Sequence, residues 1–298
     1  MSANHLIEAQ DLIIRHGSNV ALNGITLNIP RGSVTALLGR NGAGKSSFLD
    51  ACLGLIPPSA GRLEVLGMSP QKNGPQVRKR LGYVEADPHY DGHEKIGSLL
   101  AMAAAMRPET NQSFRDDLAI NMKLSMNTRA RELSRGQRTK LALCLALAHQ
   151  PELLILDEPF DGLDAGARHE ILAEIIHQVD ETRGIVIASH DLDEVERIAD
   201  RVAIIHEGTV VLEGTLDEVR GRIRRWSGPA SKGTTQTLRD AGFNVEARGD
   251  DLLVYSLDKS APDIHAFSGC DNLQLVPTNS LEEVFLASTS GHSDGDKK

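Results

Sequence analysis

The sequence is poor in aromatic residues and in cysteine, and it contains no long apolar run. Aromatic residues make up 3% of the 298 residues, so the core must be built mainly from Leu, Ile, Val and Ala side chains. The cysteines, Cys52, Cys144 and Cys270, are odd in number and widely spaced, which predicts reduced thiols rather than disulfides or a metal site. No run of about 18 consecutive apolar residues is present, so we expect no membrane-spanning helix. The N-terminal segment has no basic stretch followed by an apolar one, so we also expect no signal peptide.

The rest of the composition is that of a folded protein with an acidic surface. Hydrophobic residues make up 40% and charged residues 24%, which is ordinary for a globular domain. Asp and Glu number 41 against 32 Lys and Arg, which gives a formal net charge of −9. A surface of this sign repels phosphate backbones and argues against a nucleic-acid partner. Without a spanning helix of its own, the chain can serve a membrane only through a partner protein.

Short apolar runs alternate with helix-compatible stretches over residues 1–220. Continuous apolar strands separated by helices predict an α/β domain whose parallel sheet is covered on both faces. The expected strands are Leu6–Ile14, Ile25–Ile29, Val34–Leu38, Leu153–Leu156 and Ile185–Ala188.

The strand pattern is interrupted by a helical insert, expected at about residues 87–140. Within it, Ile96–Met106 and Phe114–Leu124 have helical patterns.

A change of character near residue 221 predicts a small C-terminal α+β domain at 221–287, followed by a disordered tail at 288–298. Ser227–Gly233 has the composition of a linker. The elements expected after it are a helix at Gln236–Ala241, strands at Phe243–Ala247 and Leu252–Tyr255 with a turn at residues 248–251 between them, and a helix at Ser280–Leu286.

A glycine-rich octapeptide fits the pattern G-x-x-x-x-G-K-[ST], directly after the strand Val34–Leu38 and at the start of a helix. Backbone N–H groups of such a loop wrap phosphates, and the helix N-terminus adds partial positive charge. Lys45 is expected to reach the β- and γ-phosphates, and the Ser46 hydroxyl is expected to bind Mg²⁺. The residues of this phosphate loop are Gly39, Arg40, Asn41, Gly42, Ala43, Gly44, Lys45 and Ser46, with Ser47 directly after it.

Two carboxylates end the strand Leu153–Leu156. At the carboxyl edge of a parallel sheet, Asp157 is placed to hold Mg²⁺ through its water shell, and Glu158 is placed to act as general base for the attacking water. Adjacent acids after a strand can also cap a helix, but together with the phosphate loop they predict a Mg-nucleotide hydrolase.

A pentapeptide before another predicted helix, Arg138–Ala148, resembles the signature motif of ABC ATPases. A serine, a glycine and a helix N-terminus form an anion site. In that family the site contacts the γ-phosphate of nucleotide bound to a second cassette, so the resemblance implies a dimer in which Ser134, Gly136 and Gln137 contact nucleotide. The pentapeptide is Leu133, Ser134, Arg135, Gly136 and Gln137.

Three further positions extend the resemblance in sequence order. His190, directly after Ile185–Ala188 and Ser189, matches the switch histidine that contacts the γ-phosphate. Asp164, in Gly162–Leu163–Asp164, matches the loop that signals across the dimer. His16 stands where the family has an aromatic ring that stacks on adenine. The resemblance implies ATP and Mg²⁺ as cofactors, with Lys45, Glu158 and His190 as catalytic residues.

The sequence departs from the family pattern at several positions. His16 offers a smaller ring than tyrosine for stacking on the base. The glutamine that links Mg²⁺ and water to the helical insert is missing: Ala86 takes its place, and either Glu85 or Asp87 could substitute for it. Ser47 replaces a common threonine, and Arg135 replaces a common glycine.

These features predict an α/β P-loop NTPase of the ABC type: the ATP-binding and ATP-hydrolysing subunit of an ABC transporter. The resemblance implies a second cassette, most simply a homodimer, and a multi-span transmembrane subunit on another chain. It also implies a position on the cytoplasmic face of the cell membrane. The C-terminal segment Ser280–Leu286 resembles the tails of single-cassette export ATPases, which favours export. The alternatives are a soluble ABC ATPase that moves no solute, such as the iron–sulfur assembly type, or a slow regulatory cassette.

Overall fold

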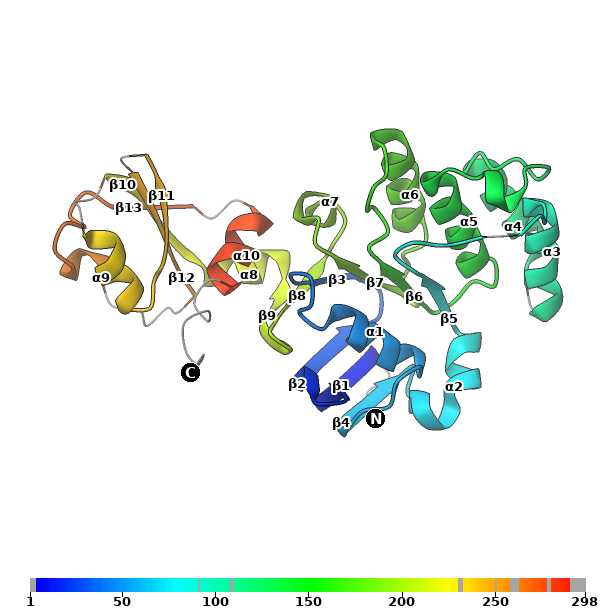
Figure 1. Ribbon diagram of the computed structural model, residues 1–298, viewed down its shortest axis with the longest axis horizontal. Coiled ribbons are helices and arrows are strands. Elements are labelled where there is room, and N and C mark those ends of the chain that lie inside the picture. The colour runs from blue at the N-terminus through cyan, green and yellow to red at the C-terminus, as the bar shows by residue number, and fades with distance from the viewer. Residues whose placement is uncertain are drawn as a thin grey trace. The chain divides into compact units, whose positions relative to one another are not determined.

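The structure, a computed structural model, describes residues 4–90, 92–107, 110–229, 233–249, 251–257, 263–277 and 280–289. The chain forms two compact units, Met1–Val210 and Val211–Lys298 (Figure 1). This division falls within strand β9 (Thr209–Thr215), before the boundary at residue 220 that composition predicts. Residues 216–220, which composition assigns to the first domain, lie in helix α8 (Leu216–Arg222). This helix belongs to the second unit and contacts α10 (Leu281–Thr289) there.

The first unit is built around a six-stranded sheet in the order β5-β6-β7-β3-β8-β9. The four neighbouring pairs from β5 to β8 are all parallel, as the continuous apolar runs predict. The strands not yet given are β3 (Val34–Leu38), β5 (Leu81–Val84), β6 (Leu153–Asp157), β7 (Gly184–Ser189) and β8 (Arg201–His206).

Both faces of this sheet are buried, because alternate residues of a strand point to opposite faces. In β6, Leu153 and Ile155 belong to one hydrophobic cluster, and Leu154 and Leu156 belong to the other. The prediction of a sheet covered on both faces is therefore confirmed.

One cluster packs the sheet against helix α1 (Lys45–Leu53) and against a separate antiparallel sheet in the order β2-β1-β4. The first two predicted strands exist, and they lie outside the parallel sheet: they form β1 (His5–His16) and β2 (Asn19–Pro30) of this second sheet, with β4 (Ala60–Val65). Their burial alternates along much of each strand, which is typical of an antiparallel sheet with one face in the core.

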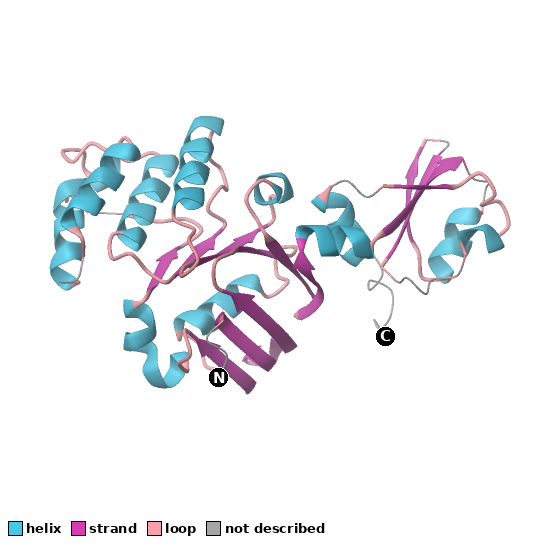
Figure 2. Cartoon of the chain, turned by 180° about the vertical axis from the view of Figure 1, so that it is seen from behind, coloured by secondary structure: helices cyan, strands magenta, loops and turns pink. Residues whose placement is uncertain are grey.

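The other cluster packs helices against the opposite face of the parallel sheet (Figure 2). The helical insert is present, with α3 at the predicted bounds and α4 close to them. Asn111 begins α4 by accepting a hydrogen bond from the Phe114 N–H (3.1 Å). The helices of this unit besides α1 are α2 (Pro70–Lys79), α3 (Ile96–Met106), α4 (Gln112–Asn121), the 3-10 turn η1 (Ala130–Glu132), α5 (Arg135–Leu147), α6 (Ala165–His177) and α7 (Leu192–Glu196).

The second unit contains a four-stranded antiparallel sheet in the order β11-β12-β10-β13. Its core holds Trp226, and the ring of Phe243 meets the rings of Trp226 and Phe267 edge to face at 5.9 and 5.8 Å. Its elements are β10 (Arg224–Pro229), α9 (Thr234–Asp240), β11 (Asn244–Arg248), β12 (Asp251–Ser256), η2 (Ile264–Ala266) and β13 (Gln274–Val276), besides α8 and α10.

Two predictions for the second unit need correction. The first three residues of the predicted linker, 227–229, lie in β10 and pair with β12, because a glycine and a proline are tolerated near a strand end. The first two residues of the predicted tail, 288 and 289, belong to α10. Linker residues 230–232, tail residues 290–298 and Asp250 of the predicted turn lie outside the described residues. Among the residues described, no helix is long and apolar enough to cross a membrane.

Candidate functional site

The phosphate loop connects β3 to α1, as the sequence predicts. Gly44 has φ 112°, and a Cβ there would lie 2.5 Å from Leu22 Cδ2 and 2.6 Å from the Ala21 carbonyl oxygen. Gly39 is also constrained, since its Cβ would lie 2.5 Å from the Ile205 carbonyl oxygen. Only glycine fits at these positions, because a larger residue would collide with the neighbouring strands. The two glycines therefore allow the loop to pack closely against those strands.

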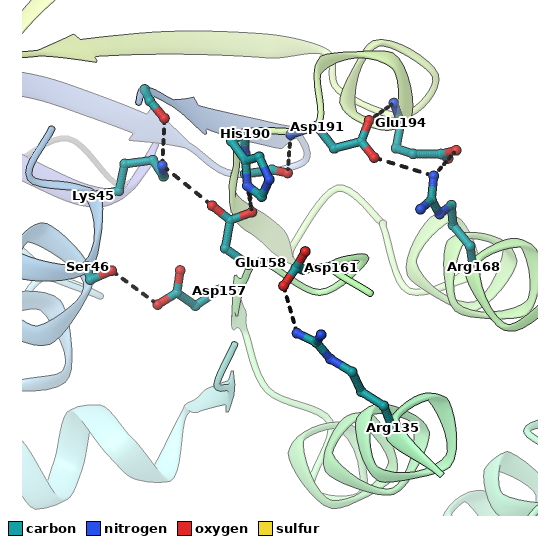
Figure 3. Close-up of polar contacts among 12 residues, drawn as sticks. Lys45, Ser46, Arg135, Asp157, Glu158, Asp161, Arg168, His190, Asp191 and Glu194 are labelled. Carbon is teal, nitrogen blue, oxygen red and sulfur yellow. Dashed lines mark hydrogen bonds and ion pairs between the residues drawn. The ribbon is translucent and has the colours of Figure 1, made fainter. Parts of the chain in front are cut away.

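Lys45, at the start of α1, is buried, and its exposed fraction is 6%. Its Nζ donates to the Gly39 carbonyl oxygen at 2.6 Å and lies 3.5 Å from Glu158 Oε1 (Figure 3). A buried ammonium needs partners of this kind, because burial without them strongly disfavours the charge. The Gly39 carbonyl oxygen and the Glu158 carboxylate supply these partners at the bottom of the loop.

Asp157 is the last residue of β6, at the carboxyl edge of the sheet, and Glu158 directly follows it. The Ser46 hydroxyl donates to Asp157 Oδ2 at 3.4 Å. Burial, and secondly the charge of Glu158, raise the pKa of Asp157, whereas Lys45 and the Ser46 hydroxyl act in the opposite direction. A desolvated carboxylate beside a hydroxyl, with other acids near it, is a donor set of hard oxygens that suits Mg²⁺. The two predicted metal ligands, Ser46 and Asp157, thus meet at one point.

His190 lies just past the end of β7 and meets Glu158. Its Nδ1 is 2.8 Å from Glu158 Oε2, and its backbone N–H donates to the same oxygen at 3.2 Å. Glu158 has φ 46°, and its own N–H donates to the Ala188 carbonyl oxygen at 2.8 Å. The tight turn at Glu158 directs its side chain between the phosphate loop and His190.

A cleft of about 490 Å³ lies over the phosphate loop. His16 borders it, and His16 Nε2 is 3.0 Å from the Ser47 hydroxyl. Most of the residues predicted to bind nucleotide or Mg²⁺ line this cleft. They are His16, Arg40, Asn41, Gly42, Ala43, Gly44, Lys45, Ser46, Ser47, Asp157 and Glu158.

Sequence reasoning missed a second part of the cleft wall. Asn19, Val20 and Ala21 of β2 line it, together with Glu207 and Gly208 of the β8–β9 turn. The N–H of Gly208 donates to the Ala43 carbonyl oxygen at 3.1 Å, which holds that turn against the loop. A glycine between two apolar strands indicates a turn, but no signal in the sequence places this turn beside the loop.

The signature residues do not line this cleft. The Ser134 hydroxyl accepts from the Gln137 N–H at 3.3 Å, and Gln137 Oε1 accepts from the Ser134 N–H at 3.0 Å, so the two form a capping box at the start of α5. Gly136 packs near Ala167 of α6, where an added Cβ would lie 3.1 Å from the Ala167 Cβ. Within a single chain, these residues form a separate helix terminus rather than part of the phosphate site.

Asp164 also lies outside the cleft and caps a helix. Its side chain accepts from the Ala167 N–H at 2.8 Å at the start of α6. In the preceding turn, Arg135 Nη2 contacts Asp161 Oδ2 at 2.7 Å, so the arginine of the signature motif is joined to the loop before Asp164.

Neither acid beside Ala86 takes the place of the missing glutamine in this cleft. Ala86 itself lines the cleft, whereas Glu85 lines a different cavity, of about 410 Å³, together with Tyr83. Asp87 is paired with Arg138 of α5, with its Oδ1 3.6 Å from the arginine Nη1. Glu85 and Ala86 therefore face two separate cavities.

Comparisons with known proteins agree with this geometry. A family profile described as ABC transporter matches residues 22–161. The bacitracin transport ATP-binding protein BcrA of Enterococcus faecalis is 32% identical over 295 residues, which cover 95% of this chain and 94% of that protein. The Nod factor export ATP-binding protein I of Burkholderia orbicola is 29% identical, with 95% and 96% covered. A solved ATP binding subunit of an ABC transporter superposes with a TM-score of 0.67 at 29% identity, covering 72% of this chain and 92% of that one.

Proposed function

This chain belongs to the ABC transporter family as an ATP-binding subunit, and on that premise we propose that two copies bind and hydrolyse ATP to power a separate transmembrane subunit. The observation that carries the proposal is the position of Glu158, which lies between Lys45 and His190 at the edge of the phosphate cleft. A charged lysine, a carboxylate and an imidazole in this order supply the groups that phosphoryl transfer to water requires.

In the proposed reaction the nucleotide phosphates displace Glu158 as the partner of Lys45. The lysine ammonium is buried and close to the phosphate loop, so its charge attracts the β- and γ-phosphates more strongly than a solvated charge does. Glu158 Oε1 is then free to accept a proton from the attacking water. His190 holds the other oxygen, Oε2, and so fixes the direction in which the carboxylate points.

Ser46 and Asp157 are the residues that would hold Mg²⁺, since their oxygens meet beside the phosphate loop. When bound, Mg²⁺ neutralises charge that develops on the phosphates. The raised pKa of Asp157 supports this role, because burial and the charge of Glu158 disfavour its carboxylate, and a bound cation would offset both.

His16 is proposed to stack on the adenine, with Ser47 holding its ring. The hydrogen bond between His16 Nε2 and the Ser47 hydroxyl orients the imidazole at the border of the cleft. An imidazole has a smaller face than a phenol ring, so this contact with the base is expected to be weak.

The second cassette is proposed to complete each site. The N-terminus of α5, with Ser134, Gly136 and Gln137, is an anion site that the phosphate cleft of its own chain does not use. Contact with nucleotide held by a second copy would use it, and Asp164 would then lie in the loop that faces that copy. This arrangement gives the capped helix a function that a single chain does not provide.

The transmembrane subunit is proposed to bind at the second cavity, on the cytoplasmic face of the membrane. Leucine and tyrosine side chains line this cavity, including Leu55, which is 62% exposed. Glu85 and Ala86 are adjacent in sequence and face the second cavity and the nucleotide cleft respectively. A partner segment that moves Glu85 would therefore shift the wall of the cleft.

The direction of transport is proposed to be export. Relatives that align over nearly the whole chain include a Nod factor export ATP-binding protein and a bacitracin transport ATP-binding protein. The alignment extends through the second unit, which supports the interpretation of the C-terminal segment as an export-type tail.

Co-purification from membranes of a tagged Glu158→Gln chain tests the proposal, with the hydrolysis rate of the wild type measured in parallel. Loss of the carboxylate should stop hydrolysis while ATP still closes the dimer. Recovery of a dimer with a multi-span membrane protein is the expected result. A dimer recovered without any membrane partner would overturn the transport role and favour an ABC ATPase that moves no solute.

A further inference from the structure

We propose that Arg168 is a positioning residue that holds His190 against Glu158 by fixing the turn that follows His190. Arg168 lies on α6, and its Nη1 is 3.4 Å from Asp191 Oδ2 and 3.2 Å from Glu194 Oε1 (Figure 3). The inference rests on the proposed role of His190 in hydrolysis and adds a residue that does not line the phosphate cleft.

The turn that Arg168 holds is also shaped by hydrogen bonds of Asp191. The N–H of Asp191 donates to the Ser189 hydroxyl at 3.0 Å, and Asp191 Oδ1 accepts from the Glu194 N–H at 3.3 Å to cap α7. Helix α7 has only five residues, too few to be stable through its own hydrogen bonds. An arginine that binds both carboxylates fixes the start and the first turn of this helix at once.

His190 cannot move independently of this turn. It is directly bonded to Ser189 and Asp191, and its backbone N–H donates to Glu158 Oε2 at 3.2 Å. A shift of Asp191 therefore changes both the backbone contact and the imidazole contact with Glu158. The distance between His190 Nδ1 and Glu158 Oε2 would therefore depend on Arg168, which lies on a different element, α6.

Burial makes the contact between Arg168 and Glu194 strong. Glu194 is 6% exposed, and among the described residues its Oε2 has no hydrogen-bond partner. A buried carboxylate strongly favours retention of its cation, because an unpaired buried charge is costly. Arg197 also contacts Glu194, at 3.4 Å, but its side chain is 67% exposed, and within the described residues it forms no ion pair with Asp191.

Arg168 also connects His190 to the loop proposed to face the second cassette. The Arg168 N–H donates to the Asp164 carbonyl oxygen at 3.0 Å, in the first turn of α6. A displacement of Asp164 would carry Arg168 with it and move Asp191. Through this connection, the fit of the second cassette would determine the position of His190.

Steady-state ATPase kinetics of Arg168→Met, compared with Arg197→Met, test the inference. Both variants remove a cation from Glu194, but only Arg168→Met releases Asp191. We expect Arg168→Met to lower kcat by about tenfold to a hundredfold, because a catalytic group misplaced by about 1 Å can cost on the order of 10²-fold in rate. KM for ATP should stay within about twofold in both variants, and kcat should stay within about twofold in Arg197→Met, because the phosphate cleft is unchanged.

Asp191→Asn provides a second variant that leaves Glu194 paired. Asparagine still caps α7 but loses the charge that Arg168 binds, so the same fall in kcat is expected without an unpaired buried charge. Equal falls in Arg168→Met and Arg197→Met would overturn the inference, because the effect would then come from the Glu194 charge alone.

Combination with His190→Ala separates this inference from the proposed function. If Arg168 acts through His190, Arg168→Met should have no further effect in the His190→Ala background. An additive loss would overturn the inference, and so would a full rate for Arg168→Met beside a loss for His190→Ala. A full rate for His190→Ala would overturn the proposed role of His190 as well.

Discussion

Glu158 Oε2 lies 2.8 Å from His190 Nδ1, and it also accepts the backbone N–H of His190 at 3.2 Å. Its other oxygen lies 3.5 Å from Lys45 Nζ. The carboxylate is thus held by the residue that follows β7 and by the first residue of α1, while its own backbone directly follows β6. Three elements that are distant in sequence fix a single side chain, and this side chain is the expected base of the reaction.

Glu158→Gln should lower kcat for ATP hydrolysis by about 10³-fold, within the range that general-base catalysis contributes. The amide keeps the shape of the side chain but cannot accept a proton from water. ATP affinity, measured with a fluorescent analogue, should not fall. Glu207→Gln is a matched control, because Glu207 also lines the cleft. A Glu158→Gln rate within tenfold of the wild type would mean that another group acts as the base.

Gly44→Ala should reduce ATP affinity at least tenfold. Gly44 has φ 112°, and the new methyl would collide with Leu22 and with the Ala21 carbonyl oxygen, so the phosphate loop must change shape. Gly221→Ala is the control, since a Cβ there meets no atom within 4 Å. Isothermal titration with ATP measures both variants. Unchanged affinity in Gly44→Ala would show that the loop tolerates a left-handed alanine.

His16→Tyr should tighten ATP binding about threefold to tenfold, because a larger ring gains stacking of about 0.5–1.5 kcal/mol. The hydroxyl of Ser47 would lose its bond to the imidazole, so Ser47→Ala serves as a control for that loss. His16→Ala should weaken binding. If all three variants bind ATP equally, His16 is only the last residue of β1 at the border of the cleft and makes no contact with the base.

Phe243→Ala should destabilise the second unit by about 3–5 kcal/mol, the usual cost of removing a buried phenylalanine. Phe243 is 3% exposed and meets the ring of Trp226, the only tryptophan in the chain. Intrinsic tryptophan fluorescence during urea unfolding therefore reports on this unit. ATP affinity should be unaffected, since every residue that lines the nucleotide cleft belongs to the first unit. A fluorescence transition unchanged from the wild type would contradict the described core.

Arg80→Met should destabilise the protein near neutral pH and have little effect in acid. A hydrogen bond from Arg80, at 2.7 Å between Nη2 and Oε2, holds the pKa of Glu152 below its ordinary value of 4.5, with a smaller contribution from Arg31. The stabilisation is present above pH 4.5 and is lost as the pH falls through the lower pKa of the folded state. Both side chains are partly exposed, so solvent screening limits the effect to about 1 kcal/mol or less.

Urea unfolding of the wild type and Arg80→Met at neutral and acidic pH measures this difference. Glu152→Gln should abolish the pH dependence of the difference, because the titrating group is gone. A difference in the free energy of unfolding that stays constant with pH would assign the effect of Arg80→Met to lost packing rather than to the ion pair.

The sequence by itself determined the parts of this protein whose chemistry is local. The phosphate loop, its strand and its helix are contiguous, and Val34–Leu38 forms β3 at the predicted bounds because an apolar run between turn residues has few alternatives. Asp157, Glu158 and His190 could be predicted because each lies at the end of a buried strand or directly after it, and parallel strands bring their carboxyl ends to one edge.

Only the tertiary structure decided the features that depend on pairing between distant segments. The apolar pattern of β1 and β2 is compatible with either sheet. In the structure β1 pairs antiparallel with both β2 and β4, so these strands form a sheet separate from the parallel one. Glu85 and Asp87 are equally close to Ala86 in sequence, yet neither lines the cleft. Glu85 lines the second cavity, and Asp87 pairs with Arg138 of α5. The contact of Arg168 with Asp191 and Glu194 has no local signal, since an ion pair between α6 and α7 exists only after the sheet has placed both helices.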